Sequence, residues 1–299
     1  MDKNGTITRE GDEVVVRAPG GAYLLEQPGV TCENSDAPES ERVYVKRFKN
    51  KRIYLPGEYE RAVKENLTGK DVLVLGMNGY SALSPAQCSA WGVQHGAYEA
   101  ACEGILRATY QSLAEAFPGI DIRFAHGASN MGVDRSIMKV ARELNRGELG
   151  HNCPKYMFYV DDDDTAVYVA ASSDEYAGAF IDSLDVLIAC NGRAQAFSHD
   201  IDAVFKKLKH VIPVNVLRSI STNGGPPAIG PDGRIEDAVA AFEQRVHMVA
   251  QQMFVASRDP FADLVVHICE AATSIARQFI SPERAFANVL PSIAWRRTK

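Results

Sequence analysis

From residue 71 onward, short runs of consecutive apolar residues alternate with segments whose apolar positions recur every three or four residues. A continuous apolar run of this length is typical of a strand buried on both faces of a parallel sheet. Such runs occupy residues 72–75, 120–125, 155–160, 166–170, 185–190 and 210–216. The helical pattern occupies residues 84–117, about 137–145, 174–183 and 198–208. Strand, glycine-containing turn and helix recur at least three times, which predicts an α/β protein with a Rossmann-like parallel sheet and helices on both faces.

The pattern divides the chain into three predicted parts. Residues 1–70 hold short β-rich runs separated by glycine and proline, which predicts a small β-rich N-terminal extension. Residues 71–217 carry the alternating pattern and form the predicted Rossmann-like core. Residues 218–299 predict a helical C-terminal region that packs on the core or at an interface. The expected β runs are 6–8, 13–17, 43–48 and 52–55, and the expected C-terminal helices span about 235–257 and 260–280.

One helix start is clearly marked. Ser84-Pro85-Ala86-Gln87 places serine at the N-cap, proline at the first helical position and glutamine three residues after the cap. This helix is expected to break near Gly92 or Gly96, because glycine disfavours a helix interior.

Composition narrows the function classes. The chain has 299 residues, of which 46% are hydrophobic, and a formal net charge of -6. A net acidic protein is a poor match for nucleic acid or for an anionic membrane. The six cysteines form no CxxC motif, so neither a zinc site nor a disulfide framework is expected. The polar N-terminus and the lack of a long apolar run favour a cytoplasmic protein without a membrane partner.

Three glycine-containing turns are predicted at the carboxyl edge of the sheet, where open α/β proteins bind their ligands. They lie at residues 76–79, 127–132 and 191–193. The alternative is that the glycines only allow tight turns between strands and helices. The candidate ligand-binding residues are Gly76, Asn78, Gly79, Gly127, Ala128, Ser129, Asn130, Gly132, Asn191, Gly192 and Arg193.

Two common phosphate-binding motifs are missing from these turns. The sequence contains no GxxxxGK[ST] motif, and the second turn is not GxGxxG. A P-loop ATPase and a simple NAD dehydrogenase are therefore not expected.

The order of these elements resembles the Rossmann-like SLOG superfamily over about residues 70–217. The resemblance rests on GMNG and HGASNMG after two strands, and on LDVLIACNGRAQAFSHDIDAVFKKLKHVIPV. The superfamily includes the Lonely Guy (LOG) phosphoribohydrolases, the molybdenum-cofactor carrier proteins, the DprA core and nucleotide-sensing domains related to the TRPM channel N-terminus. The resemblance implies a nucleotide ligand with its phosphate on the second turn, no required cofactor, and a homo-oligomer.

The sequence departs from the catalytic pattern of one group in that superfamily. LOG enzymes carry a PGGxGTxxE element after the fourth strand and an arginine on the preceding helix. The matching segment, residues 191–199, contains no glutamate, and residues 174–183 contain no arginine. The resemblance therefore implies a sensor or carrier, and leaves open a nucleotide N-glycosidase or a relative of the nucleoside deoxyribosyltransferases.

Hydrolysis of an N-glycosidic bond needs a carboxylate close to the ribose. The weak catalytic candidates are Asp200, His199, Asp134 and Glu99. Asp200 and Asp134 are equally explained as first-turn charges that favour the helix dipole. His199 is equally explained as a surface residue, and Arg193 as a solvent-exposed turn residue. A scaffold protein without a small ligand remains a further alternative.

Two other features have competing interpretations. Residues 161–164 are four consecutive aspartates, which cannot all point at one ion from an extended chain, so we expect a solvated turn and no metal site. Four aromatic residues near the first turn can stack on a base or fill the core. They are Tyr54, Tyr59, Tyr80 and Trp91.

Overall fold

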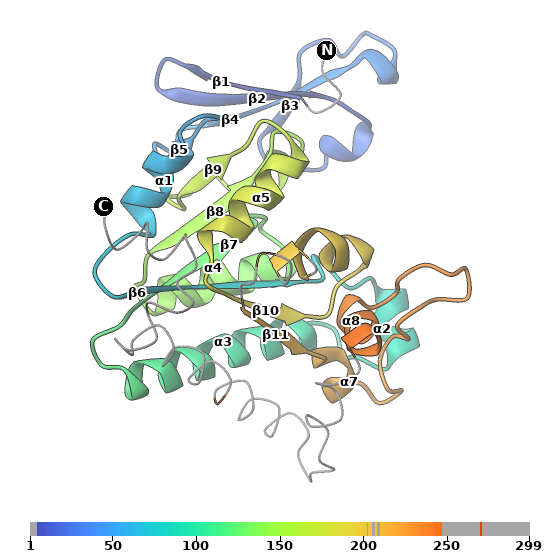
Figure 1. The fold of residues 1–299 in the computed structure, drawn as a ribbon. Coiled ribbons are helices and arrows are strands. Elements are labelled where there is room, and N and C mark those ends of the chain that lie inside the picture. Colours follow the sequence, from blue (N-terminus) through green and yellow to red (C-terminus); the bar gives the residue numbers. More distant parts are fainter. Residues whose placement is uncertain (1–4, 202, 205–206, 208–209, 247–269, 271–299) are drawn as a thin grey trace.

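The computed structural model describes residues 5–201, 203–204, 207, 210–246 and 270 (Figure 1). Its centre is a seven-stranded sheet in the order β11-β10-β6-β7-β8-β9-β5, in which every neighbouring pair is parallel. This confirms the predicted Rossmann-like parallel sheet. The strands are β5 (Ile53–Tyr54), β6 (Val72–Gly79), β7 (Asp121–His126), β8 (Glu148–Asn152), β9 (Val167–Val169), β10 (Val186–Cys190) and β11 (His210–Val214).

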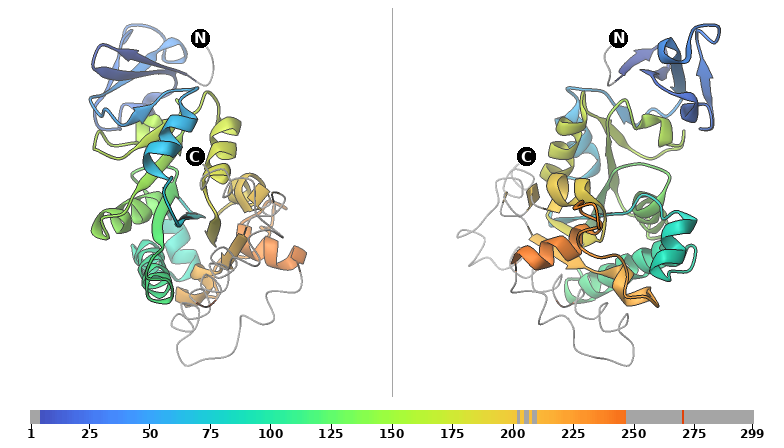
Figure 2. Two further views of the ribbon diagram at one scale, coloured as in Figure 1. Left: turned by 60° about the vertical axis from the view of Figure 1, so that its left-hand side comes forward. Right: turned by 90° about the vertical axis from the view of Figure 1, so that its right-hand side faces the viewer.

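Helices cover both faces of this sheet (Figure 2). One face packs against α3 (Ala97–Ala116) and α4 (Gly132–Glu143), together with the shorter α2 (Pro85–Trp91) and α7 (Val216–Ile220). The other face packs against α1 (Tyr59–Asn66), α5 (Ser173–Ser183) and α8 (Ala238–Val246). Two layers of helices are required because a parallel sheet buries both of its faces.

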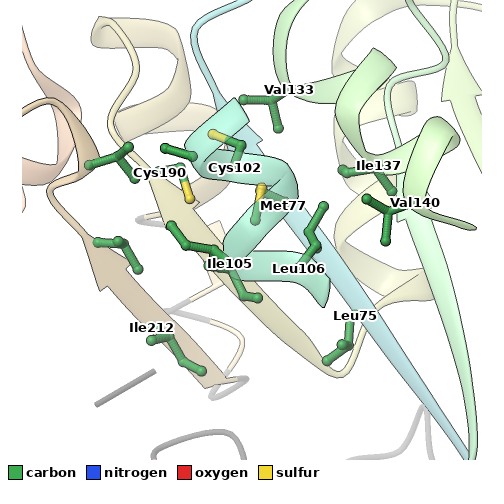
Figure 3. Close-up of a cluster of buried hydrophobic side chains, with 14 of the residues drawn as sticks. Leu75, Met77, Cys102, Ile105, Leu106, Val133, Ile137, Val140, Cys190 and Ile212 are labelled. Atoms are coloured by element: carbon green, nitrogen blue, oxygen red, sulfur yellow. The ribbon is translucent and has the colours of Figure 1, made fainter. Parts of the chain in front are cut away.

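Strand β6 shows how the sequence serves both layers. Leu75 and Met77 belong to the core cluster under α3 and α4, whereas Val74 belongs to the cluster on the opposite face. In Figure 3, Leu75 and Met77 lie among side chains from α3, α4, β10 and β11. Because side chains alternate between the two faces of a strand, this one apolar run contributes to the hydrophobic cores on both sides of the sheet.

A second, antiparallel sheet precedes the core, in the order β1-β2-β4-β3. Its inner side chains, among them Val14, Tyr44 and Phe48, share a core cluster with Phe158 and Val167. This sheet therefore packs beside β9, near one edge of the large sheet (Figure 1). Its elements are β1 (Thr6–Glu10), β2 (Glu13–Pro19), η1 (Ala22–Leu24), β3 (Val30–Cys32), η2 (Glu39–Glu41) and β4 (Val43–Phe48).

The predicted helix start at Ser84 is confirmed. The Ser84 side chain accepts from the Gln87 amide at 3.2 Å, and the Gln87 side chain accepts from the Ser84 amide at 2.9 Å. The expected break is confirmed as well, because α2 ends at Gly92 and α3 begins after Gly96. Both glycines have positive φ, 62° and 77°, a conformation that glycine adopts without steric strain.

The strand predicted at residues 155–160 is wrong. The chain there forms the 3-10 helix η3 (Met157–Tyr159), and the sheet position is taken by β8. Met157 and Phe158 are fully buried against the N-terminal sheet. The apolar run is thus explained by packing between the two sheets and not by strand pairing.

The C-terminal region is described only in part. Helix α8 lies within the first helix predicted there, whereas the second, at 260–280, falls outside the described residues except for residue 270. Strand β5 and α1 belong to the large sheet and its helical layer, although both fall within the first 70 residues. Within the described residues, no helix combines the length and apolar character that crossing a membrane requires.

Candidate functional site

The order of strands reverses between β6 and β10. From β6 the chain continues to β7, β8 and β9 on one side, and then returns to β10 and β11 on the other. The carboxyl ends of two such strands leave a crevice, the usual ligand position in this architecture. A cleft of about 480 Å³ lies there and is lined by residues that follow β6, β7 and β10.

The first predicted turn is not a turn, because β6 continues through Gly79. A Cβ at Gly76 would lie 2.8 Å from Leu184 Cδ2 and 3.2 Å from Phe180 Cζ. Gly76 therefore allows α5 to approach the strand closely and does not line the cleft. Asn78 and Gly79 lie two and three residues further along β6. Gly79 lines the cleft, and both residues line a smaller hollow of about 130 Å³ next to it.

The second turn has backbone amides that are already hydrogen bonded. The amide of Gly127 donates to Asp134 Oδ1 at 2.7 Å, and that of Ser129 to Asp134 Oδ2 at 3.4 Å. The amide of Ala128 donates to His126 Nδ1 at 3.0 Å. Those of residues 130 and 131 donate to backbone carbonyls. A carboxylate thus occupies the position at which the sequence predicted a phosphate.

The other residues of this turn serve its shape. Ala128 is buried with a φ of 62°, and Asn130 donates through its side chain to Asp161. Gly132 has a φ of 51°, and a Cβ there would lie 2.2 Å from the Ser81 carbonyl oxygen. These three residues do not line the cleft, whereas Gly127 and Ser129 do.

In the third turn, two residues stabilise the fold and one lines the cleft. Asn191 is fully buried, and its amide nitrogen donates to Asn215 Oδ1 at 2.9 Å and to Asp237 Oδ2 at 2.7 Å. Gly192 accepts at its carbonyl from the Ala238 amide. Only Arg193 lines the cleft, where its guanidinium lies 5.9 Å from the centre of the Tyr80 ring.

Three of the four catalytic candidates lie at the cleft: Asp134, His199 and Asp200. Burial, helped by the nearby Asp134, raises the pKa of Asp200 to about 6, although the hydrogen bond from Asn78 opposes the shift. Burial also raises the pKa of Asp134. Asp200 and His199 belong to η4 (Ala196–Ile201), a π-helix, which is an element often found at functional sites. Glu99, on α3, does not line the cleft.

Tyrosines supply much of the cleft wall that sequence reasoning missed. Tyr159 is the last residue of η3, Tyr156 directly precedes η3, and Tyr176 lies on α5. Burial raises the pKa of the Tyr159 and Tyr176 hydroxyls, and Asp200 and Asp134 add to the shift at Tyr176. Because the apolar run at 155–160 predicts a strand, no signal in the sequence placed the Tyr156 and Tyr159 rings beside the turns.

Of the four aromatic residues predicted near the first turn, only Tyr80 lines the cleft. Trp91 packs against Tyr80 with a ring distance of 5.6 Å. Tyr59 contacts Tyr168 at the other end of the sheet, and Tyr54 donates to Glu65. These contacts agree with the alternative that such rings fill the core.

The aspartate run bonds to the protein in several directions. Asp162 accepts from the backbone amides of Lys49 and Asn50 at 3.0 and 2.9 Å. Asp163 accepts from Arg142 and from the Thr165 amide. The run therefore ties β4 and α4 to the loop before β9.

No protein-family model matches the sequence, and no curated protein matches it. Similar solved structures include the X-ray structure of TM1055, with a TM-score of 0.32 and 17% identity over 52% of this chain and 77% of that chain. The molybdenum cofactor binding protein from the phototrophic bacterium Rippkaea orientalis has a TM-score of 0.33 and 17% identity, over 60% of this chain and 98% of that chain. The molybdenum cofactor carrier protein from Chlamydomonas reinhardtii has a TM-score of 0.30 and 18% identity, over 60% and 99%.

Proposed function

We propose that the cleft between the ends of β6, β7 and β10 binds a nucleotide or a nucleotide-derived small molecule, for which the protein is a sensor or carrier. The observation that carries this proposal is the convergence of three separated chain segments on one cleft of about 480 Å³. That volume lies within the range of small-molecule and cofactor sites, about 300–1,000 Å³.

The cleft offers both apolar and polar recognition. The rings of Tyr156, Tyr159 and Tyr176 provide surfaces on which a base can stack. Arg193 and His199 are exposed at the rim, where the Arg193 guanidinium can pair with a phosphate. Because the second-turn amides are engaged by Asp134, we place the phosphate at this rim and not on the turn.

A nucleotide N-glycosidase is the second candidate, and the state of Asp200 favours it. A carboxyl whose pKa is about 6 can donate or accept a proton near neutral pH. In that reaction water adds at C1 of the ribose, the bond to the base breaks, and the base leaves with a proton. Asp200 would activate the water or protonate the base.

Binding is tested by thermal shift and calorimetry with nucleoside mono-, di- and triphosphates, NAD and ADP-ribose. We expect at least one to raise the melting temperature, and Arg193→Gln to weaken that ligand about tenfold, the loss of one charge-assisted hydrogen bond. Arg234→Gln is the matched control, because the Arg234 side chain is 85% exposed and does not line the cleft.

Chromatography after incubation separates the two candidates. A ligand recovered intact supports a sensor or carrier. Release of free base that Asp200→Asn abolishes supports the glycosidase. No shift with any nucleotide would reject both and favour a scaffold protein.

A further inference from the structure

The floor of the cleft is built from three polar side chains. Asn78 comes from β6, Asp134 from α4 and Asp200 from η4, and all three line a hollow of about 130 Å³. Asp134 and Asp200 also line the larger cleft, so the hollow is its continuation. Rings from Tyr80 and Tyr176 close the sides.

Asn78 has a fixed orientation at this floor. Its amide nitrogen donates to Asp200 Oδ2 at 3.1 Å and approaches the Ala196 carbonyl at 3.5 Å. If the amide were flipped, its oxygen would face two other acceptors, the Ala196 carbonyl and the Asp200 carboxylate. The nitrogen therefore faces them, and Oδ1 occupies the other position of the amide. Asn78 Oδ1 is buried and has no hydrogen-bond donor, in a residue that is 7% exposed. A buried carbonyl oxygen without a donor is a vacant acceptor.

The two carboxylates enlarge this surplus of acceptors. Asp134 receives the Gly127 and Ser129 amides and the Ser129 hydroxyl, which leaves about one of its four lone-pair sites for a further donor. Within the described part of the chain, Asp200 receives one hydrogen bond, from the Asn78 amide. The cation that lines the cleft, Arg193, stacks over Tyr80 and lies at the exposed rim.

This chemistry selects one part of a nucleotide. A phosphate would meet two carboxylates and a carbonyl oxygen, which repel it. A group with several O–H donors would satisfy all three side chains. A metal ion is the less favoured occupant, since the described residues contain no group of three His, Cys, Asp or Glu side chains placed to hold one.

We infer that the floor formed by Asn78, Asp134 and Asp200 binds two neighbouring hydroxyl groups of a ribose, with the phosphate directed outward to Arg193. This inference rests on the proposed nucleotide function and specifies which end of the ligand is buried. The ligand's hydroxyls donate to the carboxylates and to Asn78 Oδ1. Selectivity for ribose over deoxyribose follows from this arrangement.

The test compares ribose 5-phosphate with 2-deoxyribose 5-phosphate, and AMP with 2'-deoxy-AMP, by calorimetry. We expect each ribose form to bind about tenfold more tightly, because a hydroxyl bonded to a carboxylate is lost in the deoxy form. Asp200→Asn should reduce the ratio to about twofold or less, since the change removes the charge that accepts the hydroxyl. Arg193→Gln should weaken both members of each pair equally and leave the ratio unchanged.

The outcomes separate the inference from the proposed function. If nucleotides bind but ribose and deoxyribose forms bind equally, the function stands and the inference fails. If ribose 5-phosphate binds with selectivity and no nucleotide binds, the floor is correct and the nucleotide function is wrong. If no probe binds, both are rejected. A ratio that changes in Arg193→Gln and not in Asp200→Asn would also overturn the inference.

Discussion

The side-chain amide of Asn78 donates a 3.1 Å hydrogen bond to the carboxylate of Asp200, across the point where the order of strands reverses. The two residues are 122 positions apart in the chain. One comes from a central strand and the other from a π-helix. The bond fixes a titratable carboxyl at the floor of the cleft, and the pH dependence of that carboxyl can be measured.

Asp200→Asn should stabilise the protein at pH 7.5 and have little effect at pH 4. Burial raises the folded-state pKa of Asp200 to about 6 from 3.8, so the folded state binds the proton more tightly than the unfolded state. Stability therefore falls as pH rises from about 4 to about 6. We expect a gain of about 1 kcal/mol at pH 7.5, after allowing for solvent screening of a half-buried group.

The measurement is urea unfolding of the wild type and the variant at both pH values. Asp232→Asn is the control, since Asp232 is exposed and pairs only with Arg234 among the described ion pairs. Equal stability of Asp200→Asn and wild type at pH 7.5 would contradict the raised pKa.

His151 should limit stability on the acid side. Burial lowers its pKa to about 3 from 6.5, and its ring lies between Tyr59, Tyr168 and Phe180. Below pH 6.5 the unfolded state takes up a proton that the folded state does not, so stability declines from about pH 6.5 toward pH 3. His151→Phe removes that loss, because phenylalanine takes up no proton.

We expect the variant to match or exceed wild-type stability at pH 7.5. At pH 5 the advantage should grow by about 2 kcal/mol, by the linkage relation. Thermal unfolding of both proteins between about pH 4.5 and pH 8 measures this difference, because that range includes the pH values at which the unfolded state takes up the proton. A constant difference between the two proteins over that range would reject the prediction.

Gly76→Ala should destabilise the protein although its backbone conformation is ordinary. The added Cβ would lie 2.8 Å from Leu184 Cδ2 and would push α5 away from β6. Overpacking of this kind costs about 1–3 kcal/mol. Gly178→Ala on the same helix is the matched control, because its Cβ would meet nothing within 4 Å.

Alanine has a higher helix propensity than glycine, so Gly178→Ala should stabilise the protein by about 0.5–1 kcal/mol. Chemical denaturation of both variants tests the pair. If both substitutions changed stability in the same direction, the close approach of α5 at Gly76 would not be the limiting contact.

Lys46→Met should loosen the tyrosine wall of the cleft. The Lys46 ammonium is buried and donates to the carbonyls of Phe158 and Val160, at 3.0 and 2.7 Å. Burial lowers its pKa, which Asp161 and Asp162 partly offset. Without this donor two carbonyls lose their partner, which costs about 2 kcal/mol.

Hydrogen exchange locates the effect. Amides of residues 156–161 should exchange faster in Lys46→Met than in wild type. Arg47→Met, the next residue of β4, removes a half-exposed cation paired with Glu10 and Glu13, and should cost about 0.5 kcal/mol or less. Unchanged exchange in residues 156–161 would show that Lys46 does not hold η3.

Local chemistry made several elements predictable. The apolar run at 72–75 has only one favourable placement, inside a sheet covered on both faces. Ser84 and Gln87 satisfy the same helix terminus whatever the rest of the chain does. Gly92 and Gly96 adopt a backbone conformation that other residues avoid, which favours the end of one helix and the start of the next at these positions.

Elsewhere, contacts with distant segments made predictions from local patterns wrong. Strand β8 has the sequence Glu-Leu-Gly-His-Asn and is buried at all five positions. Its Glu148 lies 3.4 Å from His126 of the neighbouring strand. Polar residues of this kind look like a loop until their partners are in place, whereas the apolar run at 155–160 looks like a strand until the N-terminal sheet covers it.

The candidate site divides in the same way. The sequence by itself determined that β6, β7 and β10 end in small and polar residues at one edge of a parallel sheet, because strand and turn preferences act over a few neighbours. Only the tertiary structure decided that Asp134 occupies the amides of its own turn, that Asn191 and Gly76 serve packing, and that tyrosines complete the cleft. Those roles depend on contacts between residues far apart in the chain, which local patterns do not encode.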